Sequence, residues 1–148
     1  MSPVQTTFGQ KVTTITTTQV HPLGTVRFEG NNVYKYMKAG GTIPVRSACS
    51  MSAAGTVVVG AASIKACGVN NTGTALGSGD YFWMQIGGEV TSLVLNHAEV
   101  AAGGPLSYIN ASGTLSGGTH VGTFTHIGNS TVAATHATAG VGYLSGLY

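Results

Sequence analysis

The sequence predicts an all-β protein, a compact β-sandwich or β-barrel of short antiparallel strands with an extended N-terminal arm. Glycine occurs 23 times in 148 residues and threonine recurs every few positions, and both residue types are poor in helix interiors. Helical periodicity is almost absent. Short runs of β-branched and aromatic residues alternate instead with Gly, Asn and Ser turns, the pattern of a sandwich or barrel.

Residues 1–20 are expected to form the arm. This stretch is rich in threonine, which favours extended backbone, and it contains few large apolar side chains. We therefore expect it to lie along a neighbouring molecule or to be disordered, and not to pack on its own core. The expected anchors of the arm are Val4, Phe8, Val12 and Ile15. Residues 21–148 are expected to form a single β domain.

The first clear element is a β-hairpin. Residues 25–29 and 33–37 have strand composition, and Gly30, Asn31 and Asn32 between them supply the positive φ angles of a tight turn. Charged side chains are expected on the outer face. Phe28 and Tyr36 are expected in the core.

Further strands are expected at residues 42–47, 56–59 and 64–68, followed by a small, polar loop at 70–79 that is mobile or contacts a neighbour. Residues 81–86 form the strongest strand, a nearly continuous apolar run that indicates burial on both faces. Its Phe82, Trp83 and Ile86 are expected in the core. Gly87 and Gly88 then separate it from a strand at 90–95. The last strands are expected at 106–109, 120–127, 131–136 and 140–144, with turns at 110–113 and 128–130.

The charged fraction is unusually low, at 7% against about 25% in soluble domains. No stretch approaches the ~20 apolar residues of a membrane span, so no membrane contact is expected. The six basic residues are scattered and the net charge is +2, which argues against nucleic-acid binding. Much of the exterior is therefore expected to be covered by other copies or by a partner. The first residues do not resemble a secretory signal, which indicates synthesis in a cytosol.

No catalytic, cofactor or metal site is expected, and the protein is not expected to be an enzyme. The acids Glu29, Asp80, Glu89 and Glu99 fit no catalytic motif.

His120 and His126 could share one face of a strand, but zinc sites usually need three or four ligands. Cys49 and Cys67 are interpreted as buried thiols, and a disulfide stays open if their strands are neighbours.

Four short phrases occur in the order seen in small structural proteins of tailed phages. They are His-Pro-Leu-Gly-Thr at 21–25, Asn-Val-Tyr-Lys-Tyr-Met-Lys-Ala-Gly-Gly at 32–41, Asp-Tyr-Phe-Trp-Met-Gln-Ile-Gly-Gly at 80–88 and Ala-Ala-Gly-Gly-Pro-Leu at 101–106. Over roughly residues 21–110 the chain thus resembles the capsid decoration, or cement, proteins.

The resemblance implies a virion protein on the capsid exterior that binds the expanded head and clamps neighbouring major capsid subunits. The implied partners are the phage major capsid protein and other copies of the chain, with a trimer favoured over a dimer.

Two alternatives stay open. One is a tail, fibre or head-fibre protein. The other is a carbohydrate-binding β-sandwich whose stacking platform is made by aromatic side chains. The candidates for that platform are Tyr34, Tyr36, Tyr81, Phe82 and Trp83.

Overall fold

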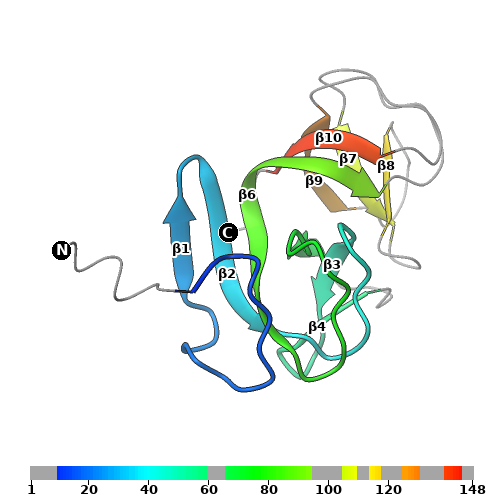
Figure 1. Cartoon of the computed structure of the whole chain (residues 1–148). Helices are drawn as coiled ribbons and strands as arrows, with labels where there is room; N and C mark the ends of the chain where they lie inside the picture. Colours follow the sequence, from blue (N-terminus) through cyan, green and yellow to red (C-terminus); the bar gives the residue numbers. More distant parts are fainter. Residues whose placement is uncertain are drawn as a thin grey trace.

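A computed structural model describes residues 10–59, 66–94, 105–109, 114–117, 125–130 and 139–144. These residues form ten strands and contain no helix, which confirms the all-β class. All strand pairs are antiparallel, and they join into one curled sheet with the order β4-β3-β5-β6-β10-β9-β7-β8, while β2 also pairs with β6 and carries β1 (Figure 1). The curl resembles half of a barrel more than two facing sheets.

The expected hairpin is confirmed as β1 (Val26–Glu29) and β2 (Asn32–Lys38). Val26 lies opposite Lys35 and Glu29 opposite Asn32, so the turn consists of Gly30 and Asn31. Gly30 has a φ of 61°, the left-handed conformation that a type II′ turn requires at its first central position. Local turn chemistry therefore sets the register of this hairpin.

The longest strand, β6 (Tyr81–Val94), holds the sheet together. Its first half pairs with β2, from Lys38 opposite Tyr81 to Val33 opposite Gly87, and its second half pairs with β10. The expected break at Gly87 and Gly88 is wrong. Gly88 has a φ of 90°, and it lets the strand bend while the hairpin tip lies against it.

Three short strands, β3 (Ala48–Met51), β4 (Val57–Val58) and β5 (Ala66–Val69), continue the sheet beyond β6. The expected strand at 42–47 is wrong: only Ile43 forms a bridge, to Leu76, and the chain turns at Arg46, whose φ is 59°. Strand pairing starts at residue 48 instead.

The polar loop at 70–79 differs from expectation in part, because Asn70, Thr72 and Leu76 are buried while Gly73, Thr74 and Ala75 are exposed. Asn70 is fully buried, and its side-chain nitrogen donates to the carbonyls of Ile43, Pro44 and Thr74 at 3.0–3.3 Å. Its side-chain oxygen accepts from the Thr72 hydroxyl at 2.7 Å. Side-chain hydrogen bonds of Asn70 thus hold the start of the loop, and Leu76 packs in the core.

The last four strands are β7 (Pro105–Ile109), β8 (Thr114–Gly117), β9 (Thr125–Ser130) and β10 (Ala139–Leu144). Strand β8 was not expected, and the turn expected at 128–130 lies inside β9, where residues 128–130 pair with β10. The strand expected at 131–136 and the turn at 110–113 lie outside the described residues.

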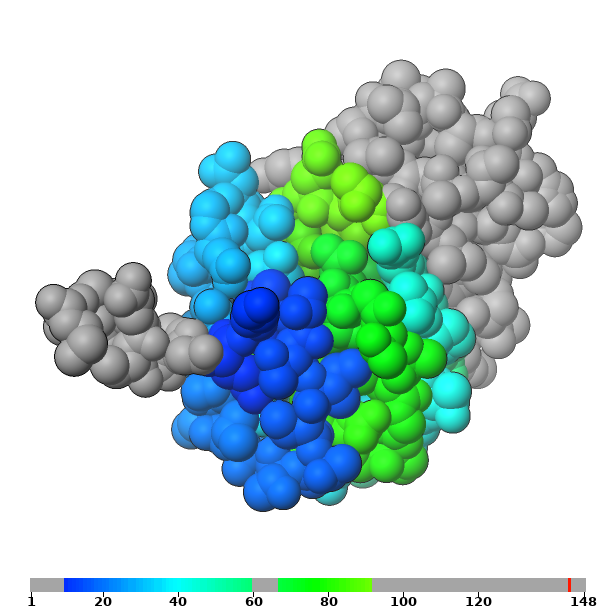
Figure 2. Space-filling model, in the orientation of Figure 1, coloured from blue at the N-terminus to red at the C-terminus, as the bar shows by residue number. Residues whose placement is uncertain are grey.

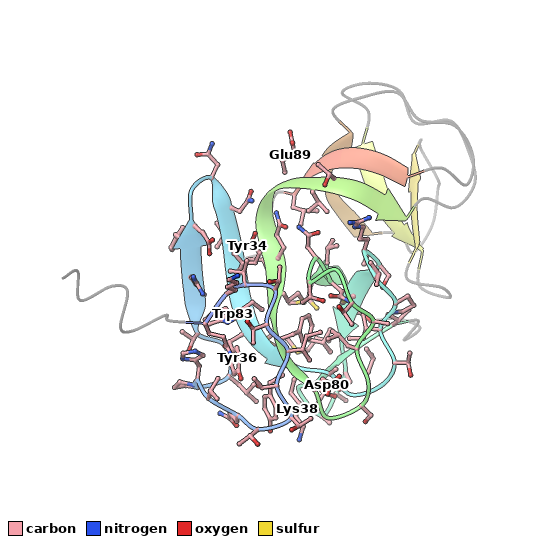
Figure 3. All side chains as sticks on the ribbon, viewed as in Figure 1. Tyr34, Tyr36, Lys38, Asp80, Trp83 and Glu89 are labelled. Atoms are coloured by element: carbon pink, nitrogen blue, oxygen red, sulfur yellow. The ribbon has the colours of Figure 1, made fainter. Side chains whose placement is uncertain are left out.

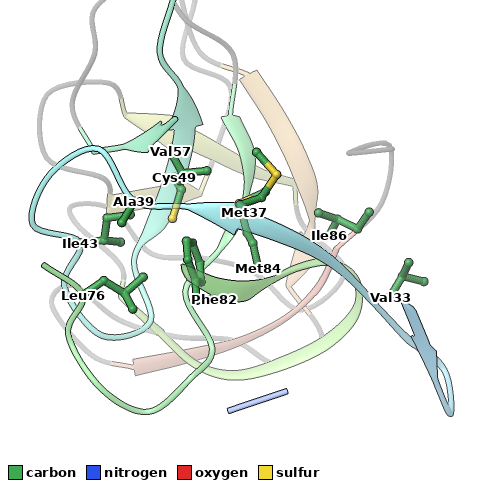
Figure 4. Packing of buried hydrophobic residues seen from close by; sticks show 10 residues of the cluster. All are labelled: Val33, Met37, Ala39, Ile43, Cys49, Val57, Leu76, Phe82, Met84 and Ile86. Atoms are coloured by element: carbon green, nitrogen blue, oxygen red, sulfur yellow. The ribbon is translucent and has the colours of Figure 1, made fainter. Parts of the chain in front are cut away.

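Side chains of β2 and β6 alternate between two apolar clusters, and this alternation places the core. Ten buried residues lie on one face (Figure 4), namely Val33, Met37, Ala39, Ile43, Cys49, Val57, Leu76, Phe82, Met84 and Ile86. The other face carries the aromatic cluster of Tyr34, Tyr36 and Trp83. The strand at 81–86 is therefore buried on both faces.

Four of the five expected core residues are buried, with 0–1% of their surface exposed: Tyr36, Phe82, Trp83 and Ile86. Phe28 is 73% exposed, so its assignment to the core is wrong. It lies opposite Val33, which belongs to the buried cluster, but β1 is one strand further out, where the cluster no longer covers the sheet.

Candidate interaction surface

The described part of the N-terminal segment packs on its own domain. The Trp83 indole N–H donates to the side-chain oxygen of Gln10 at 3.2 Å, and Thr16 exchanges two backbone hydrogen bonds with Tyr81 at 2.8 and 3.1 Å. Val12 packs against the aromatic cluster and Ile15 against the larger one. The expectation that this segment stays off its own core is wrong for residues 10–16, while Val4 and Phe8 lie outside the described residues.

The aromatic cluster fixes the course of the chain that follows (Figure 3). The His21 ring lies 5.2 Å from that of Tyr36 and 5.3 Å from that of Trp83, and the Val20 N–H donates to the Tyr36 hydroxyl at 3.2 Å. Arg27 stacks over Trp83, with its guanidinium carbon 5.6 Å from the ring centre, and donates to the Gln10 carbonyl. These contacts hold residues 10–21 against the strands that follow them in the sequence (Figure 2).

Residues 20–28 carry all the large apolar side chains that are exposed in the described part of the chain. Val20 is 52% exposed, Leu23 45%, Val26 42% and Phe28 73%. We call residues 20–28 the exposed hydrophobic segment. Exposed apolar side chains can mark a surface that binds another protein, and these four lie within nine residues of the sequence.

The same segment includes an unpaired sheet edge, because β1 pairs only with β2 among the strands that the structure describes. An unpaired edge presents backbone N–H and C=O groups that an added strand can satisfy. Sequence reasoning missed this site. The signal was the alternation of Val26 and Phe28 with Arg27 and Glu29, which is compatible with an edge strand as much as with a core strand.

The acids of the described residues have structural partners or face solvent. Glu29 forms an ion pair with Arg27 at 3.1 Å, and the Asp80 carboxylate accepts from the Gly77 N–H at 2.8 Å in a turn. Glu89 is exposed on β6 (Figure 3), and Glu99 lies outside the described residues.

Cys49 and Cys67 are free thiols, although their strands are neighbours and Cys49 lies opposite Gly68. Burial raises the pKa of Cys49 well above its usual value, and it raises the pKa of Cys67 to about 12. Cys67 also contacts the Met84 sulfur at 3.6 Å. The two thiols are therefore protonated core groups at neutral pH.

Within the described ranges, no three His, Cys, Asp or Glu side chains come together as metal ligands. Of the histidine pair considered above, His126 lies in β9, with only its backbone described, and His120 falls outside the described residues.

The aromatic residues considered as a sugar platform do not present their faces to solvent. Tyr34, Tyr36, Phe82 and Trp83 are at most 6% exposed. Tyr81 is half-buried, and the Lys38 ammonium lies 5.5 Å from its ring centre. These rings therefore stabilise the sheet and the segment that covers it.

The fold and this surface define an all-β protein with exposed apolar side chains on a hairpin whose β1 edge is unpaired among the described strands. No protein-family model, curated protein or solved structure matches the chain significantly. The phrases at 32–41 and 80–88 form β2 and the first half of β6. No helix long and apolar enough to cross a bilayer occurs among the described residues.

Proposed function

We propose that the chain is a structural virion protein of a tailed phage that binds the outside of the expanded capsid and stabilises it by clamping neighbouring major capsid subunits. The observation that carries this proposal is the exposed hydrophobic segment, residues 20–28, on a protein with only six basic and four acidic residues.

The composition of the chain makes its exposed surface poorly soluble. Side chains such as Val20 and Leu23 cost free energy in water, at roughly 25 cal/mol per Å² of apolar surface, and few charges offset this cost. Protein interfaces are depleted of charge at their centres and bury such side chains. A chain of this composition therefore lowers its free energy when these side chains are buried against another protein.

A capsid fits this need because it repeats one binding site many times. Binding to the assembled shell, but not to dissociated subunits, stabilises the shell by linkage. If several copies associate, avidity strengthens the attachment without new contacts. The ordered phrases of the sequence support the head in preference to a tail or fibre, and the burial of the aromatic rings weighs against sugar binding.

The test is co-sedimentation of the purified chain with expanded heads and with unexpanded shells assembled from the major capsid protein of the same phage. The chain should pellet with expanded heads and should raise their melting temperature. Leu23→Asp should weaken binding, whereas Ala75→Asp, which adds the same charge at an exposed loop position, should not. Absence of binding to expanded heads would refute the proposal.

A second variant tests the arm. Deletion must stop at residue 9, because Gln10, Val12 and Ile15 pack on the domain. If Val4 and Phe8 anchor the arm on the capsid, deletion of residues 1–9 lowers the affinity and leaves the domain folded. Undiminished affinity would remove the arm from the proposal and leave the exposed hydrophobic segment as the docking surface.

A further inference from the structure

We propose that two copies of the chain associate through their β1 edges, as an antiparallel strand pair centred on Phe28. The contact extends the sheet across a twofold axis and needs no capsid. It is therefore independent of the function proposed above.

Alternate residues of β1 direct their backbone groups toward β2 and away from it. The Tyr36 N–H donates to the Thr25 carbonyl at 2.9 Å, so Thr25 faces β2. Because the direction alternates along an antiparallel strand, Arg27 and Glu29 also face β2, and Val26 and Phe28 direct their N–H and C=O groups outward. Two residues per copy are thus ready to pair with another strand.

Outward residues must meet outward residues, which restricts a twofold β1 pair to a few alignments. Centring on Arg27 places two arginines opposite each other, and centring on Glu29 places two glutamates opposite each other. Both alignments are disfavoured, since like charges directly opposite are destabilising.

Two alignments remain, and charge complementarity selects between them. Centring on Val26 leaves Arg27 opposite Thr25 of the second copy. Centring on Phe28 places Arg27 opposite Glu29 of the second copy and Glu29 opposite its Arg27. The order Arg-Phe-Glu is thus self-complementary about Phe28.

The side chains support the same centre. Phe28, the most exposed large apolar residue in the described part of the chain, would lie directly opposite its own copy, as a cross-strand aromatic pair. On the other face, Arg27 already binds Glu29 of its own chain at 3.1 Å, and a second glutamate would join it. The four charges would then alternate in sign around the twofold axis.

Sedimentation equilibrium of the full chain, without capsids, tests the contact. The wild-type protein should show a concentration-dependent monomer–dimer equilibrium. Glu29→Lys places a lysine opposite Arg27 twice per dimer and should raise the dissociation constant about tenfold or more. Glu89→Lys changes the net charge equally at an exposed site on β6 and should leave it unchanged. A monomeric wild type, or an oligomer unaffected by Glu29→Lys, would overturn the proposal.

Disulfide trapping tests the register. Directly paired residues whose backbones exchange hydrogen bonds have Cα atoms about 5.5 Å apart, within disulfide range. Phe28→Cys should therefore give a covalent dimer under mild oxidation. Val26→Cys should not, because Val26 then lies opposite Gly30. The native thiols are free and buried or half-buried, and the wild-type chain controls for them. Preferential trapping of Val26→Cys, or equal trapping of both variants, would contradict the Phe28 centre.

Discussion

Substitution of Gly88 by alanine should destabilise the fold by more than its backbone conformation alone explains. Gly88 has a φ of 90°, and a Cβ atom there would lie 2.7 Å from the Asn31 carbonyl oxygen and 2.9 Å from the Asn32 Cα. These are backbone atoms of the hairpin tip, which cannot swing aside as a flexible side chain can. The bend of β6 and the position of the hairpin are therefore coupled at this glycine.

The magnitude has two parts. A non-glycine residue in the left-handed region costs roughly 1–2 kcal/mol. Forcing an extra methyl group into a packed site costs typically about 1–3 kcal/mol. Gly88→Ala should therefore lower the free energy of unfolding by about 2–5 kcal/mol.

Gly79 provides a matched control. Its φ is 94°, but a Cβ atom there would have no neighbour within 4 Å. Gly79→Ala should therefore show the conformational cost alone, about 1–2 kcal/mol. Urea unfolding followed by the fluorescence of Trp83, the sole tryptophan, measures both variants. Equal losses for Gly88→Ala and Gly79→Ala would refute the steric argument.

Three further predictions follow from burial. Asn70→Ala should lower the free energy of unfolding by about 2–3 kcal/mol, because three carbonyl groups lose their hydrogen-bond donor. Urea titrations measure this loss, and a value below about 0.5 kcal/mol would contradict the prediction. Phe28→Thr should change it by less than about 0.5 kcal/mol at dilute protein concentration, since the ring is exposed, and a larger loss would place the ring in the core. The free energy of unfolding should fall above about pH 9, because thiols of the unfolded chain ionise there while folded Cys67 keeps its proton up to a pKa of about 12. The expected loss is about 1.4 kcal/mol per pH unit for each such thiol. Urea titrations at pH 8 to about 10.5 should show a smaller loss per pH unit for Cys67→Ala than for the wild type, and an equal loss would contradict this prediction.

The sequence predicted the elements whose signal is local. The β1–β2 hairpin follows from Gly30 and Asn31, because two turn residues set both the turn type and the register. The burial of residues 81–86 follows from a continuous apolar run, and Phe82 and Trp83 indeed point into opposite clusters. Both inferences use only neighbours along the chain.

The errors concern features that depend on distant residues. Gly87 and Gly88 were interpreted as a break between two strands. Their actual role depends on the hairpin tip at residues 31 and 32, which packs on Gly88 and is distant in the sequence. The burial of Asn70 depends on its hydrogen bonds to the distant carbonyls of Ile43 and Pro44. No local pattern contains these contacts.

The candidate site was predictable only in part. The low charge indicated that some surface would be covered, but it did not locate that surface. Phe28 was assigned to the core because the alternation of side chains along a strand predicts the face on which a residue lies. The alternation does not predict how far the core extends across that face. The role of the Gln10 side chain could not be predicted either, because it accepts a hydrogen bond from Trp83, which is 73 residues away in the sequence.

The shared strand β6 has a consequence for synthesis on the ribosome. The second half of β6 pairs with β10, and β10 ends at residue 144, 50 residues after β6 ends at residue 94. At about 5–20 residues per second, the nascent chain displays that half of β6 without β10 for about 3–10 s. The part of the sheet that contains β2 and β5 can form earlier. Each new copy therefore passes through a stage in which the second half of β6 is an unpaired edge that a neighbouring chain can bind.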